Sequence, residues 1–327
     1  MEVGAETSIM DASNTPHNKA KEGEKGRLSY LALLGCNLLW AMDYPLYHIL
    51  LPRHLHPVVL LAAALLMTAL LALIPLLRHP VEPVERRDIP TLLGAALLLG
   101  VLHKGLMMCG LSRTSPIDGA IINTAGPLIV LLLSVLWGLD HLTKRKVAGL
   151  CLGITGAIGV ILWGGDEAHE KSDLIGNLMV VGSVTATAVY TVWLKKLLAK
   201  YRVTTILMWV YCLAAAIVLP FGIATLLREE VQPWDGRTIA AFVIVMCLLT
   251  YLPNFLYNMA LKRTKPVETS IFGYLQPVAA IALSVLLGLD RLHLDTLFFA
   301  LVIFIGIALV IGSYAKGKSH PHPQKGR

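Results

Sequence analysis

The chain has 327 residues, of which 56% are hydrophobic and only 15% are charged, and its formal net charge is +7. A soluble domain usually carries about 25% charged residues, so the composition argues against a water-soluble enzyme or domain. The basic residues lie in short segments between apolar runs, which argues against a nucleic-acid-binding surface and indicates a membrane protein.

Apolar runs suited to cross a hydrocarbon core of about 30 Å fill most of the chain. They are too long and continuous for the strands of a membrane barrel, so they predict helices. The predicted fold is an all-α integral membrane protein with ten transmembrane helices. The predicted spans are 28–50, 57–77, 90–111, 116–137, 146–163, 174–194, 203–227, 238–261, 266–287 and 294–315.

The segments outside these spans are polar. Residues 1–27 are predicted to be a disordered cytoplasmic tail and residues 316–327 a second cytoplasmic tail. Residues 164–173 are predicted to be an extracytoplasmic linker between two halves, 28–163 and 174–315. Five cysteines lie inside apolar runs and none forms a CxxC motif, so we expect neither a metal site nor a disulfide framework.

Lys and Arg are distributed unequally between alternate connections. With ten spans, 21 of these residues fall on the side of both termini, six on the opposite side and one, Lys104, within a span. The positive-inside rule therefore predicts that both termini are cytoplasmic. We expect a multi-pass protein of a cell membrane, such as a bacterial inner membrane, with lipid as a partner and no nucleic acid.

The sequence is duplicated with a shift of 150 residues. Leu111–Leu142 aligns with Leu261–Leu292, and the alignment superposes two prolines, Pro127 and Pro277, as well as the runs Leu-Ser-Val-Leu and Gly-Leu-Asp. Each half has five predicted spans, an odd number, so the halves would enter the membrane from opposite sides. Such inverted repeats are typical of transporters whose binding site lies at the repeat interface.

These features resemble the EamA-type transporters of the drug/metabolite transporter superfamily. The resemblance rests on the two five-span halves and on the matching segments Leu132–Leu162 and Ala282–Gly312, although Asp140 and Asp290 stand where the family usually has Glu. It implies a cavity lined by the first, third, fourth, sixth, eighth and ninth spans, with the fifth and tenth as scaffold. It also implies export of small metabolites.

Polar groups on the expected cavity spans are candidate substrate ligands, because such groups are costly in hydrocarbon. Trp40 and Tyr44 belong to a polar-aromatic stripe of the first span, beside Asp43. His103 and Lys104 interrupt the third span. The remaining candidates are Asn123, Tyr190, Tyr251, Asn254, Asn258, Tyr274 and Gln276.

Asp43 and Lys104 are expected at similar depths, about 23 Å and about 21 Å from the cytoplasmic face at 1.5 Å per residue. Three interpretations remain open. The two residues form a structural ion pair, or they bind a charged solute such as an amino acid through its ammonium and carboxylate. Alternatively, they couple transport to protons, with His103 taking part.

Asn254 and its neighbours surround Pro253, and they could bind a solute or hydrogen-bond within the helix bundle. The repeated Pro127 and Pro277 are predicted to bend their helices beside the cavity.

The chain lacks a Walker A motif, an HExxH motif and a Gly-x-Ser-x-Gly elbow. We therefore predict a secondary or facilitative transporter, and more specifically an exporter of small polar or amphipathic metabolites such as amino acids. No enzymatic activity, metal or cofactor is expected. The alternatives are an intramembrane enzyme acting on a lipid-linked substrate and a non-transporting membrane subunit.

Overall fold

The computed structural model describes residues 16–51, 53–77, 82–163, 174–229, 232–289 and 294–317, and all regular elements within these ranges are helical. The first half contains α2 (Pro16–Ala41), α3 (Asp43–Leu50), α4 (Pro57–Leu73), η1 (Ile74–Leu77), η2 (Arg86–Asp88), α5 (Ile89–Ala95), η3 (Ala96–His103), α6 (Lys104–Leu111), α7 (Pro116–Asn123), α8 (Gly126–Leu136) and α9 (Lys144–Trp163). The second half contains α10 (Leu174–Trp193), α11 (Lys195–Lys200), α12 (Val203–Leu226), α13 (Gly236–Ile244), η4 (Val245–Leu249), α14 (Leu252–Arg263), α15 (Pro266–Ile271), η5 (Phe272–Tyr274), α16 (Leu275–Leu286) and α17 (Leu294–Gly317).

Six continuous helical stretches of the described chain are long and apolar enough to cross a membrane: Arg86–Leu111, Pro116–Leu136, Leu174–Lys200, Val203–Leu226, Gly236–Arg263 and Thr269–Leu286. The multi-pass membrane protein expected from composition is thereby supported. Helices also occupy the other predicted spans. The first helix begins at Pro16 and so includes part of the predicted N-terminal tail, where Ala, Lys and Glu favour helix. Residues 1–15, the linker 164–173 and residues 318–327 lie outside the described chain.

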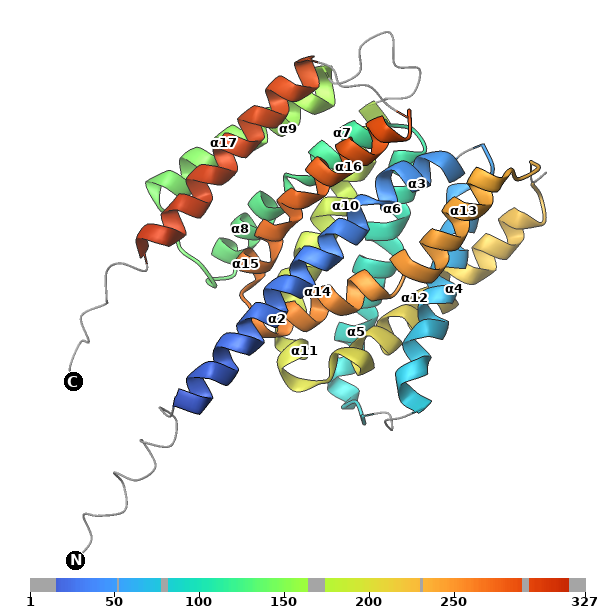
Figure 1. The fold of residues 1–327 in the computed structure, drawn as a ribbon. Coiled ribbons are helices and arrows are strands. Elements are labelled where there is room, and N and C mark those ends of the chain that lie inside the picture. Colours follow the sequence, from blue (N-terminus) through green and yellow to red (C-terminus); the bar gives the residue numbers. More distant parts are fainter. Residues whose placement is uncertain are drawn as a thin grey trace, which may run out of the picture.

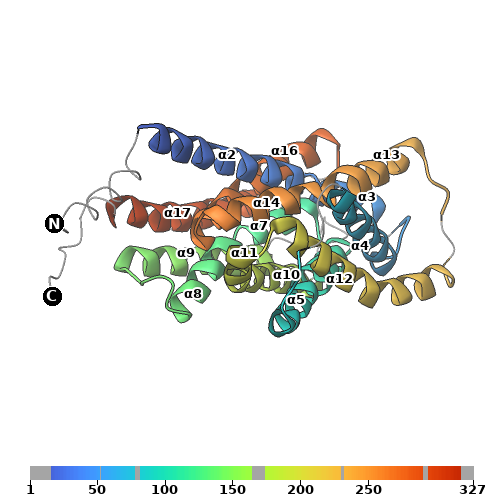
Figure 2. The ribbon, with the colours of Figure 1, turned by 90° about the horizontal axis from the view of Figure 1, so that it is seen from below.

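The helices form a flattened bundle (Figures 1 and 2). The pair α9 and α17 lies at one edge, and α4 packs against α12 at the other edge. Between these edges, α14 packs against α2, α10 against α6, and α16 against α7. Most of these contacts join the first half of the chain to the second, so the two halves share one core.

Prolines interrupt several of the central helices. Pro45 follows the break between α2 and α3, because it has no N–H to continue the ladder. Pro127 follows the break between α7 and α8, and Pro277 follows the short 3-10 turn η5. Pro127 and Pro277 thus each lie next to a change in the hydrogen-bond pattern of an otherwise continuous helical stretch.

Two π-helical segments occur at nearly the same place in the two halves. η3 begins at Ala96 and η4 at Val245, close to the 150-residue shift of the sequence duplication. Such segments are rare and are often found at functional sites. His103 ends the first segment, and Pro253 lies shortly after the second.

The duplicated Gly-Leu-Asp motif forms a tight turn in both halves. Gly138 and Gly288 have φ angles of 69° and 64°, a conformation that favours glycine. The amide of the following leucine donates to the carbonyl of Ser134 in the first copy and of Ser284 in the second. Asp140 then accepts a 2.8 Å bond from Lys146, whereas its counterpart Asp290 lies outside the described residues.

Glycines allow α9 and α17 to pack with their backbones in contact. A Cβ atom on Gly306 would lie 2.6 Å from the carbonyl oxygen of Gly149 and 2.8 Å from the amide nitrogen of Gly153. Close backbone approach at small residues is a common way to pack helices in a membrane, where lipid removes the hydrophobic driving force between helices.

The substitution Gly306→Ala should therefore destabilise the protein by about 1–3 kcal/mol, the usual cost of overpacking. Gly312→Ala in the same helix is the matched control, since no atom lies within 4 Å of the added Cβ. Thermal unfolding of the purified protein in detergent measures both variants. Equal melting temperatures for the two variants would contradict the close contact.

Candidate functional site

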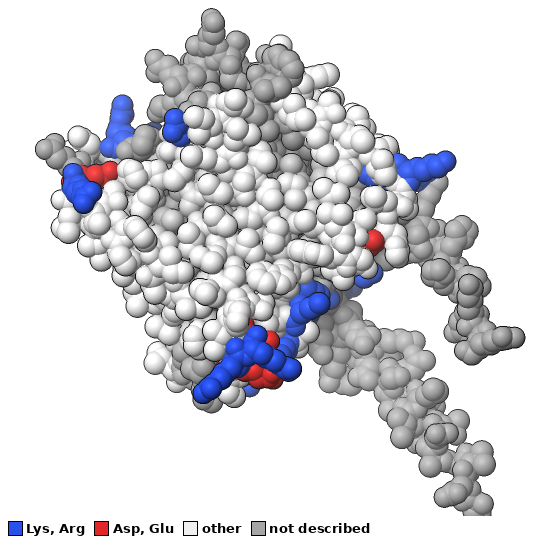
Figure 3. Space-filling model, turned by 180° about the vertical axis from the view of Figure 1, so that it is seen from behind, with Lys and Arg blue, Asp and Glu red and all other residues white. Residues whose placement is uncertain are grey.

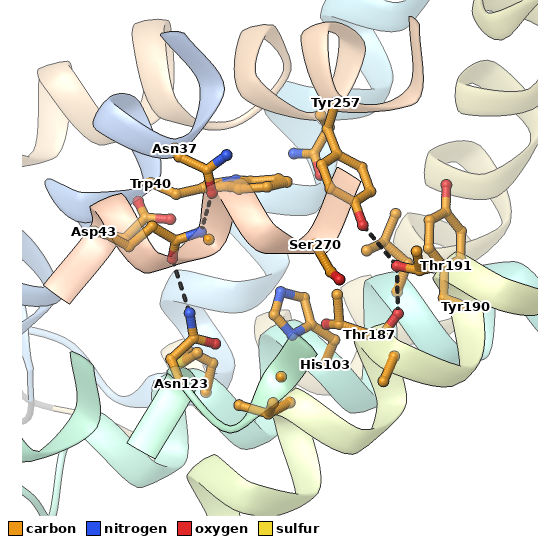
Figure 4. A pocket seen from close by; sticks show the side chains of 18 of the residues that line it. Asn37, Trp40, Asp43, His103, Asn123, Thr187, Tyr190, Thr191, Tyr257 and Ser270 are labelled. Atoms are coloured by element: carbon orange, nitrogen blue, oxygen red, sulfur yellow. Dashed lines mark hydrogen bonds between the residues drawn. The ribbon is translucent and has the colours of Figure 1, made fainter. Parts of the chain in front are cut away.

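A cavity of about 100 Å³ lies in the centre of the bundle. It is small compared with the roughly 300–1,000 Å³ of pockets for drug-sized ligands, so a larger solute would require the lining helices to move. Its lining comes from the elements α2, α3, η3, α6, α7, α8, α10, α14, α15, η5 and α16 (Figure 4). None of the described side chains of α9 and α17 belongs to this lining.

The structure brings ten of the twelve candidate residues together around this cavity. They come from eight separate elements and from both halves of the chain. The ten are Trp40, Asp43, Tyr44, His103, Lys104, Asn123, Tyr190, Asn254, Asn258 and Gln276.

Tyr251 and Tyr274 lie outside the cavity lining. Tyr251 precedes α14 at the helix interruption, and its ring stacks on Phe255 with centroids 5.9 Å apart. Tyr274 ends the 3-10 turn η5 and packs against the hydrophobic core. Both residues thus lie beside a helix interruption and outside the lining of the cavity.

Asp43 and Lys104 face the same cavity without meeting in a salt bridge. Lys104 is only 5% exposed, and within the described chain its ammonium has neither a hydrogen bond nor a salt bridge. The Asp43 Oδ1 atom is buried and also lacks a hydrogen-bond partner among the described residues. The two charges interact electrostatically without direct contact, so each can still form a hydrogen bond or ion pair with another group. The structural ion pair considered from the sequence is therefore absent from this structure.

His103 is held from one side of its ring. Its Nδ1 atom lies 2.8 Å from the Ser183 hydroxyl and 3.2 Å from the Ser183 carbonyl oxygen. Figure 4 shows the ring pointing into the middle of the cavity. Because Nδ1 is engaged by α10, Nε2 is the nitrogen that remains for a ligand or a proton.

Gln276 is the centre of a hydrogen-bond network that joins the two halves. Its Nε2 donates to Asn37 Oδ1 at 2.6 Å, and its Oε1 accepts from Asn123 Nδ2 at 2.9 Å and from the Tyr44 hydroxyl at 3.5 Å. The Asn37 amide in turn donates to the carbonyl of Leu33. Both ends of the Gln276 amide are occupied, which fixes its orientation. Figure 4 draws the bonds at Asn37 and Asn123 as dashed lines.

A second network closes the end of the cavity near α14. The Tyr257 hydroxyl lies 2.7 Å from Thr191 Oγ1, and its ring contacts Trp40 with centroids 5.1 Å apart. The Tyr190 hydroxyl donates to Asn258 Oδ1 at 2.9 Å. The hydroxyls of Tyr190 and Tyr257 thus have polar partners, and the Trp40 ring packs against Tyr257. Aromatic rings of this kind are suited to contact with an amphipathic solute.

The amides of Asn254 and Asn258 serve their own helix. Asn254 Nδ2 donates to the carbonyl of Thr250 at 2.7 Å, and Asn258 Nδ2 donates to the carbonyl of Asn254 at 2.8 Å. These bonds lie beside Pro253, where the helical ladder is interrupted. The side chains therefore stabilise the irregular backbone while they line the cavity.

Positions related by the 150-residue shift line the cavity in both halves. Six such pairs occur: Asn37 and Thr187, Trp40 and Tyr190, Lys104 and Asn254, Met107 and Tyr257, Asn123 and Gly273, and Gly126 and Gln276. Among the described residues, the two lining residues with a formal charge nevertheless both come from the first half, since Asp43 and Lys104 have no charged counterparts among the second half's lining residues. The two halves thus contribute corresponding backbone positions to the cavity, but only the first half contributes charged side chains.

Sequence reasoning did not select Thr187, Thr191, Tyr257 or Ser270, which also line the cavity. Isolated hydroxyls are common within apolar helices and attract no attention by themselves. The duplication did contain a signal for two of them, because shifting Asn37 and Met107 by 150 positions gives Thr187 and Tyr257.

Known proteins support the membrane-transport interpretation by sequence. An uncharacterized transporter of Archaeoglobus fulgidus is 24% identical over 48% of this chain, a match that spans about half of that protein's length, 53%. The uncharacterized transporter YetK of Bacillus subtilis is 23% identical over 69% of this chain and 67% of its own length. A WAT1-related protein of Arabidopsis thaliana, At4g15540, is 21% identical over 68% of this chain and 69% of its own.

A crystal structure of another protein has a similar fold, with a TM-score of 0.63 and 17% sequence identity over 86% of this chain and 98% of that one. The model of the EamA-like transporter family matches residues 27–162 and again residues 174–312, which together make up most of the chain. The chain therefore belongs to the EamA-like transporter family.

Proposed function

We propose that this transporter is a secondary carrier that moves a small polar or amphipathic metabolite by alternating access across the central cavity. The observation that carries the proposal is the pair of opposite charges, Asp43 and Lys104, which line the same central cavity without a salt bridge between them. Unpaired charges are costly within a bilayer and usually mark a solute or ion pathway.

The proposed architecture has ten spans in two inverted halves, 28–163 and 174–315, joined by the linker 164–173 on the extracytoplasmic side. Two observations support it. The cavity is lined at six pairs of positions related by the same shift, and helices of one half pack against the corresponding helices of the other, as α4 does against α12 and α9 against α17. The distribution of Lys and Arg supports cytoplasmic termini in a cell membrane.

Amino acids are the proposed solutes. Lys104 can bind a carboxylate, Asp43 can bind an ammonium group, and the rings of Trp40, Tyr190 and Tyr257 can accept an apolar or aromatic portion. The direction of transport is proposed to be export, which rests on the family resemblance. His103, with Nε2 left available, is the proposed site of coupling to protons.

Replacing either charge should impair transport without unfolding the protein. Lys104→Gln and Asp43→Asn are each expected to lower the kcat/KM of transport about 10- to 100-fold, because a charge-assisted hydrogen bond contributes about 1.5–3 kcal/mol. Uptake and counterflow of labelled amino acids in proteoliposomes measure the effect. Lys196→Gln on the exposed face of α11 is the matched control and should transport normally.

A charge exchange separates solute binding from a structural pair. If the two residues mainly stabilised each other, the double variant Asp43→Lys, Lys104→Asp would recover transport relative to the single variants. We expect no recovery, because the ammonium and carboxylate of the solute would then meet like charges. Wild-type rates in both single variants would place the binding site elsewhere.

His103→Gln should uncouple flux from the pH gradient. Counterflow, which needs no net driving force, is expected to continue in this variant, whereas uptake driven by an imposed pH gradient should fall to the level measured without a gradient. Both are measured in the same proteoliposomes. A variant that still responds fully to the gradient would exclude His103 as the coupling site.

A further inference from the structure

Charged and polar groups gather where the connection before α5 meets the segment between α11 and α12. We name this group the inner clasp: Glu82, Glu85, Asp88, Lys200, Tyr201 and Arg202. The Lys200 ammonium lies 2.6 Å from Glu85 Oε1 and 2.6 Å from Asp88 Oδ2. The Arg202 amide donates to Glu82 Oε2 at 2.8 Å.

Tyr201 connects the clasp to a third segment. Its hydroxyl donates to Asp88 Oδ2 at 2.6 Å and accepts from the Glu85 amide at 3.1 Å. Its carbonyl oxygen accepts from the Lys262 ammonium at 2.8 Å, at the end of α14. Nearby, Lys195 donates to the carbonyls of Leu261 and Thr264.

The clasp therefore crosses one end of the helices that line the cavity. Its residues adjoin α5, α10 and α14, which are parts of the third, sixth and eighth predicted spans. The beginning of α2 and the end of α17 lie toward the same end of the bundle (Figure 1). Figure 3 shows acidic and basic side chains side by side at this lower end of the molecule.

The clasp groups are charged at neutral pH. The hydrogen bond from Lys200 lowers the pKa of Glu85, and hydrogen bonds from Lys200 and Tyr201 lower the pKa of Asp88. The same carboxylates raise the pKa of Lys200. Arg87 adds a further contact, 2.5 Å from Glu85 Oε2.

At the opposite end of the bundle, the described residues related by the 150-residue shift form no equivalent cluster. A shift of 150 residues places Leu50 and Leu51 at the positions that correspond to Lys200 and Tyr201, and both leucines are buried. The counterpart of Glu85 is Asp235, which caps its own helix by accepting from the Thr238 amide at 2.7 Å. Among the described residues, the clasp is thus made by only one of the two repeats.

In an inverted repeat, the two halves exchange conformations when the carrier changes from one access state to the other. Contacts that both halves can make favour neither state, whereas contacts made at one end alone shift the equilibrium between them. We infer that the inner clasp holds the empty carrier closed toward the cytoplasm, so that the outward-facing state is its resting state. The inference rests on the proposed alternating-access function and its orientation.

The test measures access to the cavity and needs no transported solute. Thr187→Cys places a thiol in the cavity lining, and a membrane-impermeant thiol reagent is added to either side of sealed vesicles. The cytoplasmic side is defined by protease access to an N-terminal tag, and modification at residue 187 is quantified by mass spectrometry.

The clasp is broken by the double substitution Lys200→Gln, Tyr201→Phe. Asp88→Asn weakens the clasp more mildly and is used if the double variant folds poorly. Lys196→Gln, also on α11, is the matched control.

We expect the double variant to be labelled from the cytoplasmic side roughly fivefold or more faster than the Thr187→Cys parent, because it removes the contacts of Lys200 and Tyr201 with Glu85 and Asp88. Asp88→Asn should increase the rate less, Lys196→Gln should leave it unchanged, and labelling from the outside should slow as cytoplasmic labelling increases. Unchanged rates on both sides in the clasp variants would falsify the inference. Labelling does not depend on transport, so faster cytoplasmic labelling would support the clasp even if the protein transports no amino acid. If the protein transports amino acids but labelling is unchanged in the clasp variants, the clasp is refuted and the proposed transport function is not.

Discussion

Backbone hydrogen bonding within the bilayer is the constraint on which the cavity depends. An unsatisfied N–H or C=O group is costly in hydrocarbon, so an irregular backbone persists there only where protein or a polar cavity supplies partners. In this chain, the breaks at Pro45, Pro127, Pro253 and Pro277 and the π-helical segment η3 all adjoin the cavity lining. The same irregularities that would be unfavourable against lipid therefore create the space and the polar surface at the centre of the bundle.

The two halves provide similar backbone positions but different chemistry. Lys104 of the first half corresponds to the uncharged Asn254 of the second, and Trp40 corresponds to another aromatic residue, Tyr190. The aromatic and hydroxyl groups are shared between the halves, whereas the charges are confined to one of them. The two halves also differ at the end of the bundle where the inner clasp lies, since Lys200 and Tyr201 of the second half correspond to two buried leucines of the first, Leu50 and Leu51.

Much of this arrangement could be predicted from the sequence. Polar residues in long apolar runs have few stable environments in a membrane, so their type alone pointed to the cavity for ten of twelve candidates. Hydropathy, the duplication and the prolines likewise predicted the helices and two of their breaks. Local details were not predictable. Tyr251 and Tyr274, which lie beside helix interruptions, are outside the lining, and neither the two π-helical segments nor the separation of Asp43 from Lys104 has a signature in the local residue pattern.

The confinement of charge to one half also affects how a solute can be oriented. A site built from two identical halves would have a two-fold axis, and a molecule with one positive and one negative end could occupy it in two equivalent ways. With one Asp43 and one Lys104, and with Asn254 in the position related to Lys104, the two orientations are no longer equivalent. A bipolar solute that contacts both charges therefore has one preferred orientation in the cavity. In that orientation, the uncharged part of the solute always contacts the same rings and hydroxyl groups.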